Sequence, residues 1–131
     1  MQEKHLFEYA IIRVVPRVER GEFLNVGVIV YCPSKRFLCS RHVLDGTKLY
    51  QLDPEIDLET LKKYLQVFEL VCKGGPEGGR IGQMSISERF HWLTATRSTI
   101  IQTSPVHLGL AADPDEALNR LFDQQVSKSM Q

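Results

Sequence analysis

The stretch from Arg13 to Val30 reads RVVPRVERGEFLNVGVIV, and it decides how the fold begins. It joins two apolar runs through a polar connection that starts at Pro16 and contains Gly21, and both of these residues disfavour continued strand pairing. Extended outward, the runs cover residues 6–15 (LFEYAIIRVV) and 23–32 (FLNVGVIVYC), which are rich in Val, Ile, Phe and Tyr. Such runs are typical of β-strands. We therefore predict that an N-terminal β-hairpin starts the sheet.

The hairpin also suggests a register. If Val15 lies near Phe23, Arg13 lies opposite Asn25 and Ile11 lies opposite Gly27. One face is then almost wholly apolar and should cover the main core; its expected pairs are Val14 with Leu24, Ile12 with Val26, and Ala10 with Val28. The other face mixes aromatic side chains with Arg13, Asn25 and Gly27, so we expect it to form the wall or floor of a pocket.

The middle of the chain predicts a third strand and then a helix. Residues 36–43 favour a strand, and residues 48–52, after a turn at Asp45–Gly46, favour a further short one. Asp53 at an N-cap position and Pro54 at the first helical position predict the start of the helix. Gly74–Gly75 ends it. Its apolar face recurs at three- and four-residue spacing over Leu58, Leu61, Leu65, Phe68 and Val71.

The last third predicts two more helices. Ser85 and Glu88 fit a capping box before a short helix over residues 89–95, and residues 97–102 resume a strand-like pattern. Asp113, followed by Pro114, repeats the N-cap pattern for a terminal helix. Strands that cluster early and helices that follow indicate an α+β fold. We expect a mostly antiparallel sheet started by an N-terminal hairpin, with two or three helices packed on one face.

Composition sets limits on function. The 131 residues carry a formal net charge of zero, which argues against general nucleic-acid binding, because that needs a strongly basic face. The length suits one domain over residues 6–126, with frayed termini at 1–5 and 127–131. A charged N-terminus and short apolar runs predict neither a secretion signal nor a membrane span. Three irregularly spaced cysteines predict no disulfide framework. We therefore expect a cytoplasmic protein.

The hairpin carries the first candidate binding site, formed by Arg13, Arg17, Arg20, Glu22 and Asn25. Polar groups inside apolar strands are costly unless they are paired or used. Arginine presents a planar fork of donors that suits a carboxylate or a phosphate, so these residues predict an anion site. The alternative is an internal network in which Arg13 pairs with Glu22 or Asn25 and fixes the hairpin register.

A second cluster of hydrogen-bonding side chains follows in the last third of the chain, at Arg97, Ser98, Thr99 and Gln102. These residue types suit a phosphate or a peptide backbone. They equally suit a loop that satisfies its own polar groups. We expect this cluster to converge with the hairpin residues and to line one shared cavity.

A catalytic group is harder to name. His107, after Ser104–Pro105, is the candidate acid or base, and Ser104 with His107 and Asp113 could in principle form a nucleophilic arrangement. The four histidines are scattered and the chain lacks a metal-ligand spacing, so we expect neither a metal nor a cofactor.

Two long motifs resemble a bacterial family catalogued as domain of unknown function 3037. They are FEYAIIRVVPRVERGEFLNVGV, which begins at Phe7, and FHWLTATRSTIIQTSPVHLGL, which begins at Phe90. The resemblance covers the chain from Phe7 to about Val126. It implies no activity. It does imply a partner or accessory role, because such proteins are often encoded beside kinases that resemble the toxin half of a toxin–antitoxin pair.

Two functions follow as hypotheses. The first is a small cytosolic binding or accessory module that acts on an unknown ligand, on a kinase-like protein partner, or as a homo-oligomer. The alternative is an enzyme that acts on a phosphate-bearing or nucleotide-like substrate through an Arg/Ser/His site.

Overall fold

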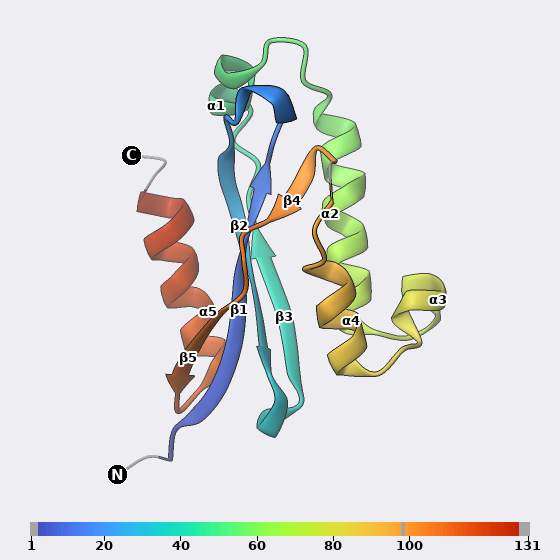
Figure 1. The fold of residues 1–131 in the computed structure, drawn as a ribbon, viewed down its shortest axis with the longest axis vertical. Helices are drawn as coiled ribbons and strands as arrows, with labels where there is room; N and C mark the ends of the chain where they lie inside the picture. The colour runs from blue at the N-terminus through green and yellow to red at the C-terminus, as the bar shows by residue number, and fades with distance from the viewer. Residues whose placement is uncertain (1–2, 98, 129–131) are drawn as a thin grey trace.

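The computed structural model describes residues 3–97 and 99–128, and these form one antiparallel five-stranded sheet with helices on both faces (Figure 1). The strands are β1 (His5–Val14), β2 (Leu24–Cys32), β3 (Phe37–His42), β4 (Ile101–Thr103) and β5 (His107–Ala111). β2 and β3 extend the sheet on one side of β1. On the other side, β4 pairs with the end of β1 and β5 pairs with its beginning. The α+β fold with an N-terminal hairpin is confirmed.

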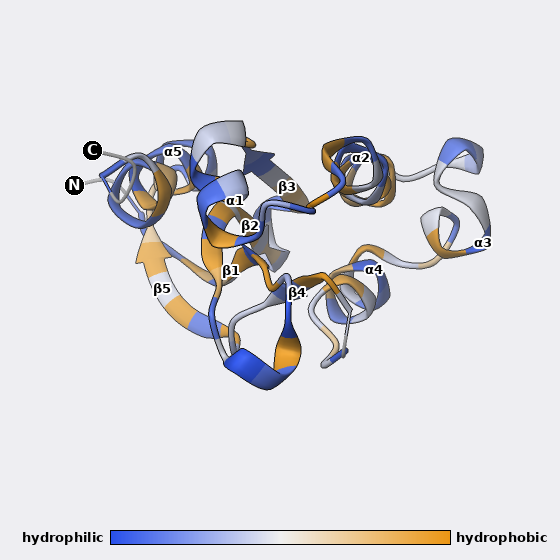
Figure 2. Ribbon diagram, turned by 90° about the horizontal axis from the view of Figure 1, so that it is seen from above, coloured by the Kyte–Doolittle hydropathy of each residue, from blue (hydrophilic) through white to orange (hydrophobic). Residues whose placement is uncertain are grey.

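The helices are α1 (Gly46–Leu52), α2 (Leu58–Lys73), α3 (Gly79–Gly82), α4 (Ile86–Leu93) and α5 (Pro114–Phe122). A π-helical segment, Asp123–Ser127, continues α5. Residues of α1, α2 and α4 share a core with one sheet face, as expected. The terminal helix α5 was predicted, but not on this side: the helices were expected on one face only, and α5 covers the opposite face with Leu118, Leu121 and Phe122 (Figure 2). Within the described residues, no helix has the length and apolar character needed to cross a bilayer.

The predicted hairpin register is correct for Arg13 and Val14, next to the turn, and wrong from Ile12 towards the start of β1. Arg13 pairs with Asn25 and Val14 with Leu24, but a bulge follows, and Gly27 pairs with Ile12 instead of Ile11. Val26 is the additional residue, because it lies between the partners of Ile12 and Arg13. From Val26 onward β2 is buried on both faces, so residues 26–32 contain no charged or amide side chain that would mark the slip.

Two helix starts also differ from the prediction. The expected strand at 48–52 is part of α1, because the Asp45 carboxylate accepts the Lys48 amide and caps a helix there. Asp53 ends that helix, and Asp57 caps α2. Gly74, with a φ of 79°, ends α2 as predicted.

The strand predicted at 97–102 is shorter and later, over Ile101–Thr103, and β5 was not predicted. The short helix starts at Ile86, capped by Ser85, rather than at Arg89. The expected fraying of the termini falls partly on residues 1–2 and 129–131, which lie outside the described residues. His5 belongs to β1, and Ser127 belongs to the π-helical segment.

Candidate functional site

The hairpin connection holds three of the predicted site residues near one another. A short 3₁₀ turn, Val18–Arg20, joins β1 to β2, and Gly21 closes it with a φ of 68°. The Nε atom of Arg20 lies 2.8 Å from a Glu22 carboxylate oxygen, and both side chains are about half exposed. Arg17 is exposed as well. Glu22 thus neutralises Arg20 in solvent and does not pair with Arg13.

Three predicted site residues form a row across the sheet. Arg13 is the direct cross-strand partner of Asn25 on one side and of Gln102 on the other. Directly opposed residues point to the same face, so the three side chains project from the same face of the sheet. The Asn25 amide donates to the Gln125 carbonyl at 3.1 Å and holds the π-helical segment. Gln102 donates to the Thr99 carbonyl at 2.9 Å.

Arg13 has an unusual environment in this row. Its guanidinium carbon lies 4.2 Å from the centroid of the Phe23 ring, a cation–π geometry. Its Nε is buried without a hydrogen-bond partner, and so is the Oδ1 of Asn25. Neither the Glu22 nor the Asn25 pairing of the internal-network hypothesis therefore forms. The row therefore holds two buried polar atoms without a hydrogen-bond partner, but three cavities within the described residues are lined by neither Arg13 nor Asn25.

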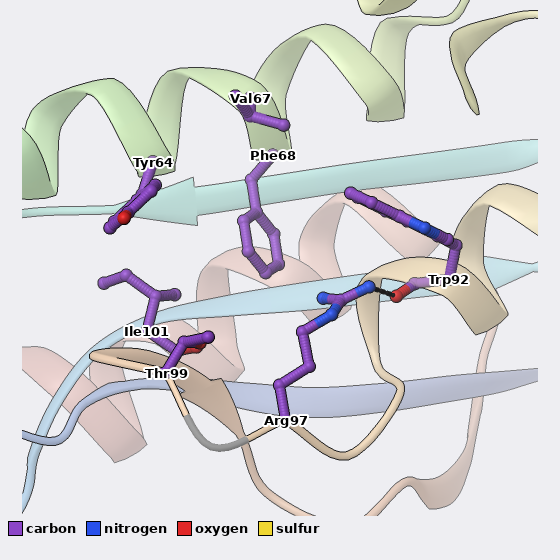
Figure 3. Close-up of a pocket in the computed structure, with 7 residues that line it drawn as sticks. All are labelled: Tyr64, Val67, Phe68, Trp92, Arg97, Thr99 and Ile101. Carbon is purple, nitrogen blue, oxygen red and sulfur yellow. Dashed lines mark hydrogen bonds between the residues drawn. The ribbon is translucent and has the colours of Figure 1, made fainter. Parts of the chain in front are cut away.

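Arg97 and Thr99 lie beside a different feature, a cavity of about 320 Å³ bounded by α2, α4 and β4 (Figure 3). Its lining residues are Tyr64, Val67, Phe68, Trp92, Arg97, Thr99 and Ile101. Ile101 pairs with Val14 and belongs to the α2 face of the sheet, whereas the next residue, Gln102, pairs with Arg13. Successive side chains of a strand point to opposite faces. The cavity and the Arg13 row therefore lie on opposite sides of the sheet, and the expected shared cavity does not form.

Arg97 is the charged group of this cavity. Its guanidinium carbon lies 4.3 Å from the centroid of the Trp92 ring, and the guanidinium donates a hydrogen bond to the Trp92 carbonyl oxygen (Figure 3). Burial lowers the pKa of Arg97, although an arginine stays charged at neutral pH. Among residues 3–97 and 99–128, no carboxylate forms an ion pair with it. A half-buried cation thus faces a mainly apolar and aromatic cavity.

The family model described as protein of unknown function (DUF3037) matches residues 9–126, most of the chain. The chain belongs to this family. No curated protein and no solved structure matches it. The matched range contains both the Arg13 row and the Arg97 cavity.

Two of the three catalytic candidates of this DUF3037 protein, Ser104 and Asp113, have structural roles. Ser104 is buried; its Oγ accepts the Ile11 amide at 2.8 Å and donates to the Pro105 carbonyl at 2.9 Å. Asp113 caps α5 by accepting the Asp115 amide. His107 is exposed on β5, and its ring centroid lies 5.3 Å from that of Tyr9. These three residues do not form a nucleophilic arrangement.

Thr99 is exposed, and its hydroxyl donates to the Ile101 carbonyl at 2.7 Å. Ser98 lies outside the described residues. Within the described part of the chain, no cluster of three or more His, Cys, Asp or Glu side chains could hold a metal ion.

Sequence reasoning missed the aromatic half of the cavity. Phe68 was assigned to the apolar face of the predicted helix, because helical spacing alone does not separate a cavity wall from a core. A usable signal was the arginine that follows Trp92 by five residues, since an arginine after a helix end can fold back over the last turn, as Arg97 does here.

Proposed function

We propose that this protein is a small binding module and that its cavity between α2, α4 and β4 holds a flat, apolar ligand with one negatively charged group. The observation that carries the proposal is Arg97: a half-buried guanidinium that stacks on Trp92 and lacks an acidic partner in the described structure. A partly desolvated cation gains most from an anion that enters its site.

The size and lining of the cavity support this ligand class. A volume of about 320 Å³ is near the lower end of the range for small-molecule sites, which begins at about 300 Å³. Figure 3 places Arg97 and Trp92 toward one end and Tyr64 and Ile101 toward the other. An aromatic or other planar body would contact the rings, while its acidic group would meet the free donors of the guanidinium fork.

The lining also favours binding over turnover. The described residues around the cavity supply one cation, two hydroxyls and four apolar or aromatic side chains, and none is a histidine, cysteine or carboxylate. General acid–base catalysis usually needs one of those groups within hydrogen-bond distance of the ligand. This composition supports the binding module and disfavours the Arg/Ser/His enzyme.

The acidic group could belong to a free metabolite or to a protein partner. For the second source we propose an acidic segment next to an aromatic residue, as a kinase-like partner could present. We also propose a bacterial cytoplasmic location. The three free thiols, Cys32, Cys39 and Cys72, support a reducing compartment.

The test is a binding screen with two kinds of probe, planar aryl carboxylates and short acidic peptides that contain tryptophan, read by thermal shift and calorimetry. A probe at a hundred times its Kd should stabilise the fold by about 2.7 kcal/mol. Arg97→Gln should abolish the effect, and Arg97→Lys should retain part of it, because it keeps the charge and loses the fork.

Arg13→Gln is the matched control, since it also removes a guanidinium that lies over an aromatic ring but lies on the other sheet face. It should bind the probes like the unmodified protein. Binding that is lost in Arg13→Gln and retained in Arg97→Gln would move the site to the hairpin and overturn the proposal. Circular dichroism of each variant checks that the fold is intact.

A further inference from the structure

The strand β5 forms an open edge of the sheet. It pairs with β1 over His5–Tyr9 on one side, and within residues 3–97 and 99–128 no strand pairs with its other side. Figure 2 shows β5 at the margin of the molecule, coloured largely as hydrophobic. Unpaired edge strands offer their backbone donors and acceptors to another chain.

The exposed side chains of this edge are leucines. Leu108 is 66% exposed and Leu110 is 60% exposed. Leu6, the cross-strand partner of Leu110, is 54% exposed on the same face. Large exposed leucines that are neighbours in space form an apolar patch, and such patches mark interaction surfaces.

The two edge strands of the sheet differ in the charged residues that they carry. β3, at the opposite edge, carries the exposed Arg41 and follows Lys35 and Arg36 directly. Charges of this kind discourage pairing of an edge with another chain. β5 reads HLGLA and has no Lys, Arg, Asp or Glu. The β5 edge therefore lacks the protection that the β3 edge has.

The order of residues in β5 points to the occupant. Leu108 and Leu110 lie symmetrically about Gly109, so the three central residues of the strand read the same in both directions. In a two-fold interface residue i of one copy meets residue j of the other and j meets i, so pairing about Gly109 places leucine against leucine twice. The strand carries no net charge that would repel its own copy.

We infer that β5 is a homodimer interface, at which a second copy of this chain adds its own β5 in antiparallel orientation. Gly109 of each copy lies at the two-fold axis, and Leu108 of one copy faces Leu110 of the other. The two sheets become one continuous sheet, and both leucine rows merge into a single apolar strip. Cross-strand apolar pairs of this kind stabilise antiparallel sheets.

Gly109 suits the centre of such an interface. A Cβ at this position would lie 2.4 Å from the Phe7 ring, so the glycine lets β5 lie close to β1 on the face turned away from the leucines. A larger residue at position 109 would push β5 away from β1, and with it the two exposed leucines.

Sedimentation velocity over a range of concentrations tests the inference. The chain has a mass of 15.0 kDa, and we expect a species of twice that mass. Leu108→Lys should give the monomer, because it places a lysine at each end of the leucine strip. The control is Tyr50→Lys, which changes a 46% exposed residue of α1 and should leave the dimer intact. A wild-type protein that stays monomeric, or a dimer that survives Leu108→Lys, overturns the inference.

Cross-linking tests the register directly. We expect a mixture of Leu108→Cys and Leu110→Cys proteins to form a disulfide-linked dimer on mild oxidation, whereas each variant alone should not. The reason is that only the mixed pair brings the new thiols directly opposite each other, at the Cβ separation of about 3.5–4.5 Å that a disulfide needs. The native cysteines are the same in every sample. Equal cross-linking in all three samples, or none in the mixture, overturns the register.

Discussion

At the scale of single residues, Ser104 is a catalytic candidate by sequence that has a structural role in the fold. It lies between β4 and β5, where the chain changes from one stretch of β1 to the next. Its backbone amide donates to the Ile11 carbonyl at 2.8 Å, and its hydroxyl accepts the Ile11 amide at 2.8 Å. Ile11 pairs with Val28 on the β2 side, and Ser104 supplies the missing backbone partner on the β4–β5 side.

This role predicts a large cost for Ser104→Ala. The change leaves the buried Ile11 amide without an acceptor, which should destabilise the protein by about 1–3 kcal/mol. The measurement is the urea midpoint at constant slope. Ser87→Ala is the control, because it removes an α4 hydroxyl whose hydrogen bonding is exposed to solvent, and it should change stability by less than about 0.5 kcal/mol. Equal midpoints for the two variants would contradict the role of Ser104.

Single residues of the candidate site could be predicted from the sequence. A cation within an apolar strand pointed to Arg13, and Arg13 does lie between Asn25 and Gln102 with an unpaired Nε. The choice of partner was not visible. Glu22 would have lain near Arg13 only if the two strands had continued their pairing up to it, and in the structure it instead forms an ion pair with Arg20 in the turn.

At the scale of elements, helix starts depend on which of several acidic residues caps the backbone. Asp45, Asp53 and Asp57 all precede apolar residues, and local pattern favoured Asp53 because Pro54 follows it. The structure instead ends one helix at Asp53 and begins the next after Asp57. Each choice depends on where Leu49 and Leu61 reach the core, and that is a tertiary constraint.

The cap at Asp57 predicts a pH effect. Hydrogen bonds from the Thr60 hydroxyl and from the Thr60 and Glu59 amides hold the pKa of this carboxyl below its ordinary value of 3.8. A lowered pKa in the folded state means that the cap stabilises α2 fully above 3.8 and is lost as the pH falls through the folded value. We expect the melting temperature to drop on acidification through this range.

Asp57→Asn isolates the effect, because the amide oxygen can still accept the backbone hydrogen bonds but does not titrate here. The difference in melting temperature between wild type and Asp57→Asn should shrink as the pH falls below 3.8. An NMR titration of Asp57 gives the pKa itself. A value at or above 3.8 would contradict the predicted direction.

At the scale of the whole molecule, β1 and β2 serve two cores at once. Ile11 and Ile12 are neighbours in the chain, yet Ile11 packs with α5 and Ile12 packs with α2. This double burial explains why the hairpin was easy to predict and its faces were not, because strands buried on both sides carry no polar alternation. It also means that neither core can open without exposing a full face of the shared strands.

The shared strands predict that both cores unfold together, and two buried thiols can report on them separately. Cys32 lies in the α5 core and is 1% exposed, while Cys72 lies in the α2 core, where burial raises its pKa to about 12. Such thiols react with a disulfide reagent only when the protein opens. Variants that keep one of these cysteines, with the others changed to alanine, therefore measure each core.

Leu121→Ala in α5 should destabilise the protein by about 2–5 kcal/mol and raise the labelling rate roughly thirtyfold or more. If the molecule opens as one unit, the rate rises by the same factor at Cys32, beside the mutation, and at Cys72, on the far side of the sheet. Leu65→Ala in α2 is the reciprocal control and should act equally on both thiols. A rise confined to Cys32 after Leu121→Ala would show that α5 detaches alone, because Cys72 stays protected as long as α2 remains packed on the sheet.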